Sequence, residues 1–331
     1  YDVKIAATRW GACPSKTTLE ELDTDEDKHL STLFLQQNLN KQPELFIQIS
    51  IPNEFQPVGK YNIGCTAGIE SDVCPAEWIE GINRMDMTFT SSEHSKKVFQ
   101  NSMFEKRNKQ TNILEGNVKL EKPVEVLFEG VNTDIYKVIE RNQVKNINLD
   151  SIKEDFAYLF VGHWMQGDIG EDRKNVGMLI KCFVEAFKDS PNKPALVLKT
   201  SSATFSVKSR ESIKNKIKEI TSGIENPPPI HLLYGELKDV EMNELYNHPK
   251  IKVMVNLTKG EGFGRPLLEF SLTKKPIITT NWSGHIDFLN KDFVTLIDGT
   301  LTNVHPSAAN QWIHKEFKWF SPDTGQAGHY L

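Results

Sequence analysis

The stretch that decides the fold is Glu261-Gly262-Phe263-Gly264-Arg265-Pro266-Leu267-Leu268-Glu269, in which seven residues separate two glutamates. An apolar run of strand length, Ile251 to Leu257, precedes it, and a second one, Pro276 to Thr280, follows. Pro266 suits the first position of a helix, where its missing N–H costs nothing. The glycines suit a tight turn that exposes backbone amides. The pattern therefore predicts a strand, a glycine-rich loop carrying Glu261, and a helix with Glu269 in its first turn.

Such a loop and helix start form an anion site, because free N–H groups and the helix dipole attract phosphate. Two carboxylates there would repel the phosphate itself. They are expected instead to accept hydrogen bonds from hydroxyl groups attached to the phosphates, as in a ribose and a sugar. The alternative is an ordinary strand, turn and helix with acidic residues in the first helical turn. The spacing alone leaves both interpretations open.

The composition limits the function classes. At 331 residues the chain is long enough for two domains, and 38% apolar and 25% charged residues are typical of a soluble globular protein. A net charge of −5 argues against a nucleic-acid partner. The four cysteines are too scattered for a disulfide framework or a zinc site, so we expect reduced thiols in a cytoplasmic protein. No apolar run reaches the roughly 18 residues of a membrane span, and no signal peptide is evident.

Strand-length apolar runs alternate with helix-periodic segments in the first half. We expect strands at Val3–Thr8, Leu45–Ile49, Asn62–Ala67, Met87–Thr90 and Val124–Phe128. We expect helices near Asp25–Asn38, Pro75–Asn83 and Glu93–Asn101. The polar stretch from Thr133 to Ser151 has no core pattern and is interpreted as a linker.

A second alternating series follows the linker. Its expected elements are Phe156–Val161, Lys174–Lys188, Ala195–Lys199, Ser209–Ile220, Ile230–Tyr234, Asp239–Asn247 and then the two-glutamate unit. The alternation implies an α/β protein with parallel sheets covered on both faces. Two series predict two doubly wound domains that face a cleft, the first formed by residues 1–150 and the second by residues 151–305. Residues 306–331 form a final segment. Ligands of such sheets bind beyond the carboxyl ends of the strands, where Glu261 lies.

Cations that suit a diphosphate follow two strands of the second series. Arg173 and Lys174 stand at a predicted helix start, in reach of phosphate oxygens through charge-assisted hydrogen bonds. Lys199 ends an otherwise apolar strand and points into the cleft or extends to its rim. The alternative for all three is a solvated surface cation.

In the first half, Glu70 and Asp72 follow the strand Asn62–Ala67. Carboxylates at such a position suit hydroxyl recognition or proton transfer. Helix capping is the alternative and fits Asp72, so Glu70 is the functional candidate. Ser92 is expected to cap the helix at Glu93.

Two other motifs are rejected. Asp23-Thr24-Asp25 resembles a metal-binding Asp-x-Asp but follows no buried strand, so we expect no metal site. Gly260, Gly262 and Gly264 resemble a dinucleotide fingerprint, but the third glycine of that pattern would stand at Arg265. A nicotinamide dehydrogenase is therefore not expected.

The signature Glu261-Gly262-Phe263-Gly264-x-Pro266-x-x-Glu269, followed by Lys275-Pro276-Ile277-Ile278, resembles that of family-4 retaining glycosyltransferases (group 1 glycosyl transferases) of the GT-B fold. The resemblance covers nearly the whole chain. Its further segments are Phe160-Val161-Gly162, Arg173-Lys174, Leu179-Ile180, Tyr234-Gly235, Leu245-Tyr246, Gly130-Val131-Asn132 and Glu70-Ser71-Asp72 with Trp78, Met85-Asp86 and Ser92.

The resemblance implies two Rossmann-like domains and roles for the candidate residues. Glu269 would bind the ribose of a nucleotide sugar, and Glu261 the hydroxyls of the transferred sugar. Lys174 matches the phosphate-binding lysine of the family. The family usually has arginine, a diphosphate contact, at the position of His163, and many members have histidine at the position of Glu70. The amides of Gly262, Phe263 and Gly264, with Arg173 and Lys199, complete the expected donor site, and Glu261, Glu70 and Lys174 the catalytic set.

The resemblance also has implications for the two ends of the sequence. Tyr1–Gly11 resembles the second strand of the family's first domain, so we expect the first βα unit, on the order of 25 residues, to be missing. We expect the final segment, around Trp312, Phe317 and Trp319, to form a helix that crosses back onto the first domain.

The sequence thus predicts a hexosyltransferase that moves a sugar, with retention and without a metal, from a nucleoside-diphosphate sugar to a hydroxyl of a glycan, lipid or protein. A UDP- or GDP-linked donor is expected, with no separate cofactor. The competing hypotheses are an epimerase or phosphorylase on the same fold, or a non-catalytic protein that binds nucleotide sugars.

Overall fold

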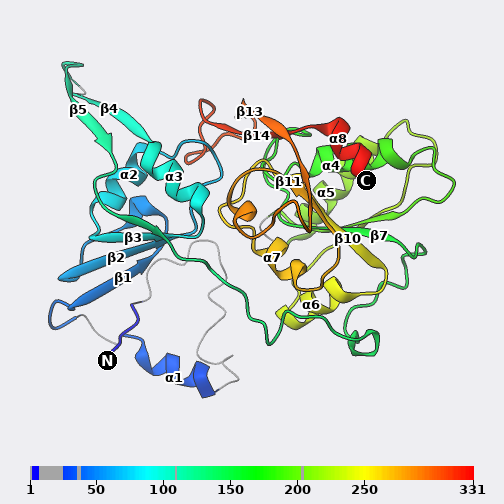
Figure 1. The fold of residues 1–331 in the computed structure, drawn as a ribbon, viewed down its shortest axis with the longest axis horizontal. Helices are drawn as coiled ribbons and strands as arrows, with labels where there is room; N and C mark the ends of the chain where they lie inside the picture. Colours follow the sequence, from blue (N-terminus) through cyan, green and yellow to red (C-terminus); the bar gives the residue numbers. More distant parts are fainter. Residues whose placement is uncertain (1, 7–24, 36–38, 109, 203–204) are drawn as a thin grey trace.

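The computed structural model describes residues 2–6, 25–35, 39–108, 110–202 and 205–331. In this part of the chain, two parallel sheets form the centres of two domains (Figure 1). One sheet has the strand order β1-β2-β3-β6, and the other has the order β12-β11-β10-β7-β8-β9. An α/β fold with two parallel sheets is what the alternating pattern predicts.

The first sheet consists of β1 (Leu45–Ile49), β2 (Tyr61–Thr66), β3 (Met87–Thr90) and β6 (Val124–Val126). Helices α2 (Ala76–Asn83) and α3 (Glu93–Asn101) cover one face, where Trp78, Ile82 and Phe99 pack into a single core. Along β1 the other face stays exposed in the described residues, with Ile49 81% exposed. Within the described residues, α2 and α3 are thus the helices whose side chains form the core of this sheet.

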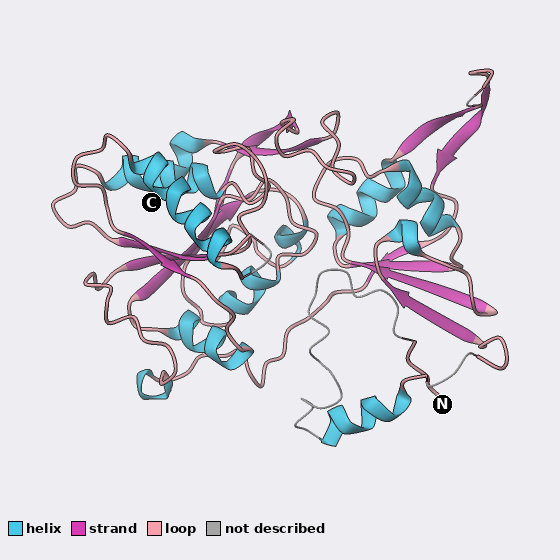
Figure 2. Ribbon diagram, turned by 180° about the vertical axis from the view of Figure 1, so that it is seen from behind, coloured by secondary structure: helices cyan, strands magenta, loops and turns pink. Residues whose placement is uncertain are grey.

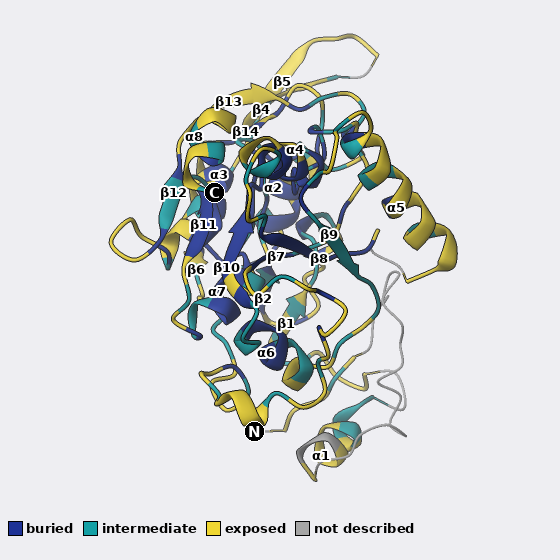
Figure 3. Ribbon diagram, turned by 90° about the vertical axis from the view of Figure 1, so that its right-hand side faces the viewer, coloured by how far each residue is buried: buried dark blue, intermediate teal, exposed yellow. Residues whose placement is uncertain are grey.

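The second sheet consists of β7 (Ala157–Val161), β8 (Ala195–Lys199), β9 (Ile230–Leu233), β10 (Ile251–Asn256), β11 (Ile277–Thr280) and β12 (Thr295–Ile297). Its central strands are buried on both faces, as Figure 3 shows. One core lies beneath α4 (Val176–Phe187), α5 (Val207–Thr221) and α8 (Thr324–Tyr330). The other lies beneath α6 (Asp239–Asn247) and α7 (Arg265–Ser271). Each large side chain buried there contributes about 1.5–3 kcal/mol, so the second sheet is held from both sides.

Several predicted elements occur at the predicted residues: β1, β3, α3, β8 and α6. Others differ by a few residues at their ends, because terminal turns fray. The predicted strand Val3–Thr8 is not a sheet strand in its described part, where Ile5 forms an isolated bridge with Phe34. Thr8, like Asp23 and Thr24 of the rejected metal motif, lies outside the described residues. Helix α1 (Asp25–Leu33) ends before the predicted Asn38, and residues 36–38 also lie outside the description.

The hairpin of β4 (Met103–Arg107) and β5 (Leu114–Lys119) was not predicted. It projects away from the first domain (Figures 1 and 2). Its residues are mostly exposed, and so they lack the alternation of apolar and polar residues that marks a half-buried strand.

The final segment corrects another expectation. Residues around Trp319 form a strand, β14 (Lys318–Pro322), paired with β13 (Gly299–Asn303), rather than a helix. The terminal helix α8 packs on α4 of the second domain. The segment nevertheless reaches the first domain, since Trp312 lies 6.2 Å from Trp78 between ring centroids.

The predicted linker has no regular structure except a short 3₁₀ turn, η2 (Arg141–Gln143). It is fastened to α6, because the backbone N–H groups of Lys145 and Asn146 donate to the carboxylate of Glu244. Leu149 and Ile152 are buried in the second core. The segment therefore belongs to the second domain by its contacts. Across the described residues, none of the helices has the length and apolar content that would carry it through a bilayer.

Candidate functional site

The loop between β10 and α7 lies at the carboxyl edge of the second sheet, against the first domain. A Cβ at Gly260 would stand 2.0 Å from the carbonyl oxygen of Glu70, and one at Gly262 would stand 2.3 Å from that of Ala67. Gly264 has a left-handed φ of 96° at the helix start. Only glycine fits these positions, because backbone from the other domain or the turn itself leaves no room for a side chain.

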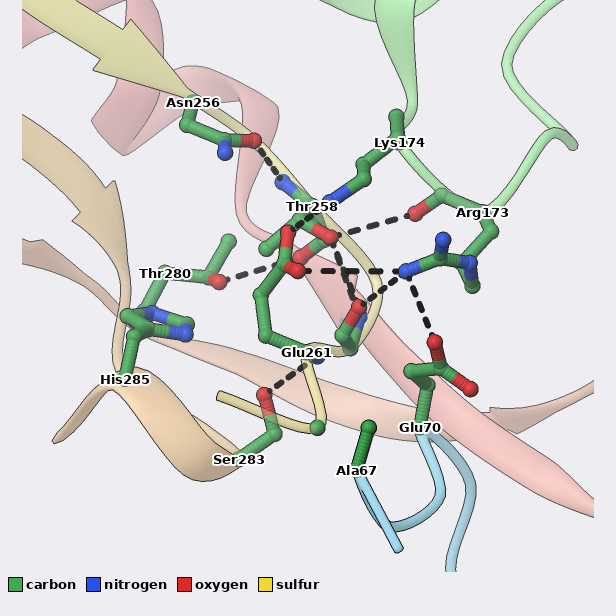
Figure 4. Close-up of polar contacts among 12 residues, drawn as sticks. Ala67, Glu70, Arg173, Lys174, Asn256, Thr258, Glu261, Thr280, Ser283 and His285 are labelled. Carbon is green, nitrogen blue, oxygen red and sulfur yellow. Dashed lines mark hydrogen bonds and ion pairs between the residues drawn. The ribbon is translucent and has the colours of Figure 1, made fainter. Parts of the chain in front are cut away.

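Glu261 forms an ion pair with Lys174 in the centre of this region (Figure 4). Both side chains are buried, with relative exposures of 7% for Glu261 and 10% for Lys174. The amide of Glu261 donates to Ser283 Oγ at 2.9 Å, which holds the loop in place. Burial raises the pKa of Glu261, but the positive charges of Lys174 and Arg173 outweigh burial and hold that pKa below its ordinary value. Glu261 is therefore a buried carboxylate at neutral pH.

Arg173 joins this pair to the first domain. Its Nη1 lies 3.1 Å from Glu70 Oε1, 3.8 Å from Glu261 Oε2, and donates to the carbonyl oxygen of Gly260 at 3.2 Å. The structure thus brings together four of the predicted residues: Glu70, Arg173, Lys174 and Glu261. Two cations and two carboxylates balance one another, which reduces the cost of burying the charges.

Glu269 lies apart from this cluster, with partners of its own. The prediction that it lies in the first turn is wrong, since α7 begins at Arg265 and Glu269 is its fifth residue. Tyr246 donates to Glu269 Oε2 at 2.8 Å, and Arg265 Nε lies 3.2 Å from Oε1. Burial raises the pKa of Glu269 in spite of both contacts. The two glutamates of the signature therefore occupy separate polar environments.

Lys199 and His163 lie at the ends of neighbouring strands. Lys199 Nζ donates to the carbonyl oxygen of Gly235 and lies 5.4 Å from the centre of the Phe205 ring. His163 Nδ1 lies 3.1 Å from Ser201 Oγ. Burial lowers the pKa of His163, and the charges of Lys174, Arg173 and Lys199 lower it further, so the imidazole is neutral near pH 7. No direct contact joins Lys199 or His163 to Glu261 in the described residues.

Phe263, whose backbone amide is a candidate phosphate contact, also has a packing role. Its ring lies 5.0 Å from Phe128 of the first domain and 5.1 Å from Phe288, between ring centroids. Ser91 Oγ donates to the carbonyl oxygen of Gly262 at 3.3 Å. The loop that carries the candidate site is therefore also a contact surface between the domains.

Sequence reasoning missed a group of residues that follow β11. Ser283 supports the loop at Glu261, and His285 Nε2 lies 2.7 Å from the carbonyl oxygen of Thr280. Thr280 Oγ1 in turn donates to the carbonyl oxygen of Thr258. A signal was available, because the polar run Asn281-Trp282-Ser283-Gly284-His285 follows an apolar strand at the binding edge of the sheet.

Further contacts hold the domains together around the site. The amide of Glu93 donates to Asp287 Oδ2 at 2.7 Å, and the amide of Lys318 donates to Asp72 Oδ1 at 2.7 Å. His94 packs edge-on against Trp282, 4.6 Å between ring centroids. Burial lowers the pKa of His94 to about 4, so this contact is made by a neutral ring. The domains therefore meet in a closed arrangement.

In the described residues, no group of three or more His, Cys, Asp or Glu side chains is arranged to hold an ion. Positive charge at the candidate site comes from Arg173 and Lys174 instead.

Comparison with known proteins is informative at the level of structure. Neither models of protein families nor curated protein sequences match the chain. Sucrose-phosphate synthase from Thermosynechococcus elongatus aligns with 77% of this chain and 60% of its own, at 13% identity and a TM-score of 0.51. The E. coli trehalose-6-phosphate structure bound with UDP-2-fluoro glucose aligns with 77% of this chain and 62% of its own, at 11% identity and a TM-score of 0.50.

These solved structures are glycosyltransferases of the GT-B fold, in which two Rossmann-like domains face each other. The chain has that fold. It spans 60% and 62% of the length of these two proteins. At such low identity the likeness establishes the architecture alone.

Proposed function

We propose that this protein is a retaining glycosyltransferase, similar to family 4, that transfers a hexosyl group from a nucleoside-diphosphate sugar to a hydroxyl acceptor. The observation that carries the proposal is the buried cluster of Arg173, Lys174 and Glu261 at the carboxyl edge of a GT-B sheet, facing Glu70 of the other domain. Buried charges are costly to retain and cluster at functional sites.

In this proposal Lys174 and Arg173 bind the diphosphate, together with Lys199 and the amides of residues 262–264. Each cation already has a carboxylate partner, so the donor's phosphates take over contacts that Glu261 and Glu70 make in the structure. The cations then stabilise the negative charge that develops on the leaving diphosphate. They supply the charge that a divalent metal provides in other transferases, which makes the proposed reaction metal-independent.

Glu261, released from part of its contact with Lys174, accepts hydrogen bonds from hydroxyls of the transferred sugar. Glu269 accepts them from the ribose once Arg265, whose side chain is 71% exposed, moves off its Oε1. Neutral His163 borders the diphosphate, and Glu70 faces the acceptor. These roles rest on the positions of the residues and on the resemblance to the family signature.

The stereochemical proposal also rests on that resemblance. The acceptor oxygen attacks the anomeric carbon from the face that the diphosphate leaves. The bond from the anomeric carbon to the diphosphate oxygen breaks as the new glycosidic bond forms, and the acceptor proton passes to the departing diphosphate. The configuration at the anomeric carbon is thereby retained.

Donor binding tests the proposal. We expect titration calorimetry to detect UDP-glucose or its GDP counterpart, and Glu269→Gln and Lys174→Met to weaken that affinity about tenfold or more, because each removes a charge-assisted contact. UDP-glucose comes first because one structure of this fold holds UDP-2-fluoro glucose. Unchanged affinity in both variants, each shown to be folded, would reject the assignment. A product assay then separates transfer from epimerisation, phosphorolysis or binding alone.

A further inference from the structure

A cavity of about 500 Å³ lies on the side of the second domain opposite the candidate site. One wall is the linker, through Arg141, Lys145 and Asp150. The other wall comes from residues that precede the amino ends of β7 and β10, including Asp155 and His248. The site at Glu261 lies beyond the carboxyl ends of the same strands. The cavity is therefore separate from the proposed donor site.

The cavity is positively charged in a chain whose net charge is −5. Arg141, Lys145, Lys250 and Lys252 line it together with only two carboxylates, those of Asp150 and Asp155. Lys250 Nζ donates a hydrogen bond to the carbonyl oxygen of Ile152. Within the described residues, the charged groups of Arg141, Lys145 and Lys252 form no ion pair, although two carboxylates line the same space.

The pKa of His248 reflects the charges at the inner wall of the cavity. Burial lowers its pKa, and the charges of Lys275, Lys250 and Arg141 lower it further, while Asp150 acts in the opposite direction. The cations thus outweigh the acids where the cavity meets the end of α6. A small anion placed there would gain Coulomb energy without having to displace an existing ion pair.

We propose that this cavity is a binding site for a small phosphate-bearing molecule, with the phosphate held by Arg141, Lys145 and Lys252. Its volume lies in the range of small-molecule sites, about 300–1,000 Å³. Unpaired guanidinium and ammonium groups form strong charge-assisted hydrogen bonds with phosphate oxygens. The carboxylates of Asp150 and Asp155 are positioned to accept hydrogen bonds from hydroxyls, so a phosphorylated sugar is the occupant that uses both kinds of group.

A ligand in this cavity would contact both the linker and the second sheet. The linker joins the two domains and runs along the lower side of the second domain in Figure 1. A phosphate held by Arg141 and Lys145 on the linker and by Lys252 at β10 would add to the contacts with Glu244 that already fasten the linker to the second domain.

Titration calorimetry on the full chain at low ionic strength tests this, with glucose 6-phosphate, inorganic phosphate and glucose as probes. We expect both phosphates to bind and glucose not to bind. Tighter binding of glucose 6-phosphate than of phosphate identifies the sugar phosphate as the better occupant. The double variant Arg141→Ala/Lys252→Ala should weaken phosphate binding about tenfold or more, since two charged hydrogen bonds are lost.

The control is Lys208→Ala/Lys218→Ala, which removes the same charge from the exposed side of α5. Equal affinities in the two double variants would overturn the proposal. Binding that survives in Arg141→Ala/Lys252→Ala but is lost in Lys174→Met would also overturn it, because it would place the phosphate in the cleft. Both double variants alter exposed side chains, and their melting temperatures verify that they are folded.

Discussion

Glu70 of the first domain and Arg173 of the second form an ion pair across the domain boundary, with Oε1 and Nη1 3.1 Å apart. The pair is largely enclosed, since the two side chains are 24% and 22% exposed. The same guanidinium also faces Glu261 at 3.8 Å. A donor diphosphate that uses Arg173 must therefore compete with a carboxylate of the protein itself, and opening the domain boundary removes that competitor.

The variant Glu70→Gln removes the competing charge. We expect its affinity for UDP to rise about two- to fivefold, which corresponds to the 0.5–1 kcal/mol typical of a partly exposed ion pair. Transfer to an acceptor should fall, because Glu70 is proposed to face that substrate. Calorimetry and a turnover assay measure the two effects separately. Asp72→Asn, which alters a domain contact made with Lys318 and not with Arg173, should leave the affinity unchanged. A lower UDP affinity in Glu70→Gln would contradict the competition.

The buried pair of Lys174 and Glu261 makes a prediction about stability. Lys174→Met leaves the carboxylate of Glu261 buried with only the more distant Arg173, and should lower the free energy of unfolding by about 3–5 kcal/mol. The double variant Lys174→Met/Glu261→Gln removes both charges and should recover much of that loss. Urea unfolding of the wild type, Lys174→Met, Glu261→Gln and the double variant completes the cycle. Additive losses would show that the two side chains are not coupled.

The lowered pKa of Glu261 predicts a dependence of stability on pH. Because its pKa is lower in the folded than in the unfolded protein, the ionised group contributes stability above its ordinary value of 4.5. That contribution is lost as the pH falls through the lower, folded pKa. We expect the difference in unfolding free energy between wild type and Glu261→Gln to shrink over this acidic interval. A difference that is constant from pH 7 to the acid limit of folding would contradict the assignment.

Gly262 lies where the two backbones meet. Gly262→Ala places a methyl group 2.3 Å from the carbonyl oxygen of Ala67, so we expect a loss of about 1–3 kcal/mol as the contact shifts. The matched control is Gly328→Ala in α8, where a new methyl group meets nothing within 4 Å. It should be neutral or stabilising by up to about 1 kcal/mol, since alanine favours helix. Thermal melts compare the two. Equal melting temperatures would mean that the domains do not meet at Gly262 in solution.

Tyr246 donates to Glu269 and thereby favours its ionised form, against the burial that raises its pKa. Tyr246→Phe should raise that pKa further. If ionised Glu269 binds the ribose, the loss of UDP affinity on acidification then begins at a higher pH in the variant. Tyr158→Phe is the control, because the hydroxyl of Tyr158 contacts Leu331 on the opposite face of the sheet. Superimposable pH profiles would remove Glu269 from the donor site.

Much of the fold could be predicted because its elements bury continuous apolar runs. The strand Ala195–Lys199 is buried throughout, and α3 (Glu93–Asn101) begins at Ser92, whose hydroxyl caps it as predicted. Strands β4 and β13 were not predicted because their side chains are largely exposed. The pairing of one strand with another cannot be recognised in a single sequence. β14 was not predicted for a different reason: Trp319 and Phe320 are adjacent and both buried, so the strand lacks the alternation of buried and exposed residues.

The sequence by itself determined the α/β alternation, the glycine-rich loop between a strand and a helix, and the residue types available at the carboxyl edge of the sheet. These follow from local periodicity and backbone geometry. Only the tertiary structure decided that Glu261 pairs with Lys174, that Arg173 reaches Glu70, and that Tyr246 donates to Glu269. Lys174 and Glu261, 87 residues apart, meet through the packing of loops within the second domain, whereas Arg173 and Glu70 meet through the packing of the two domains. Burial then favours a counter-charge beside each ionised group.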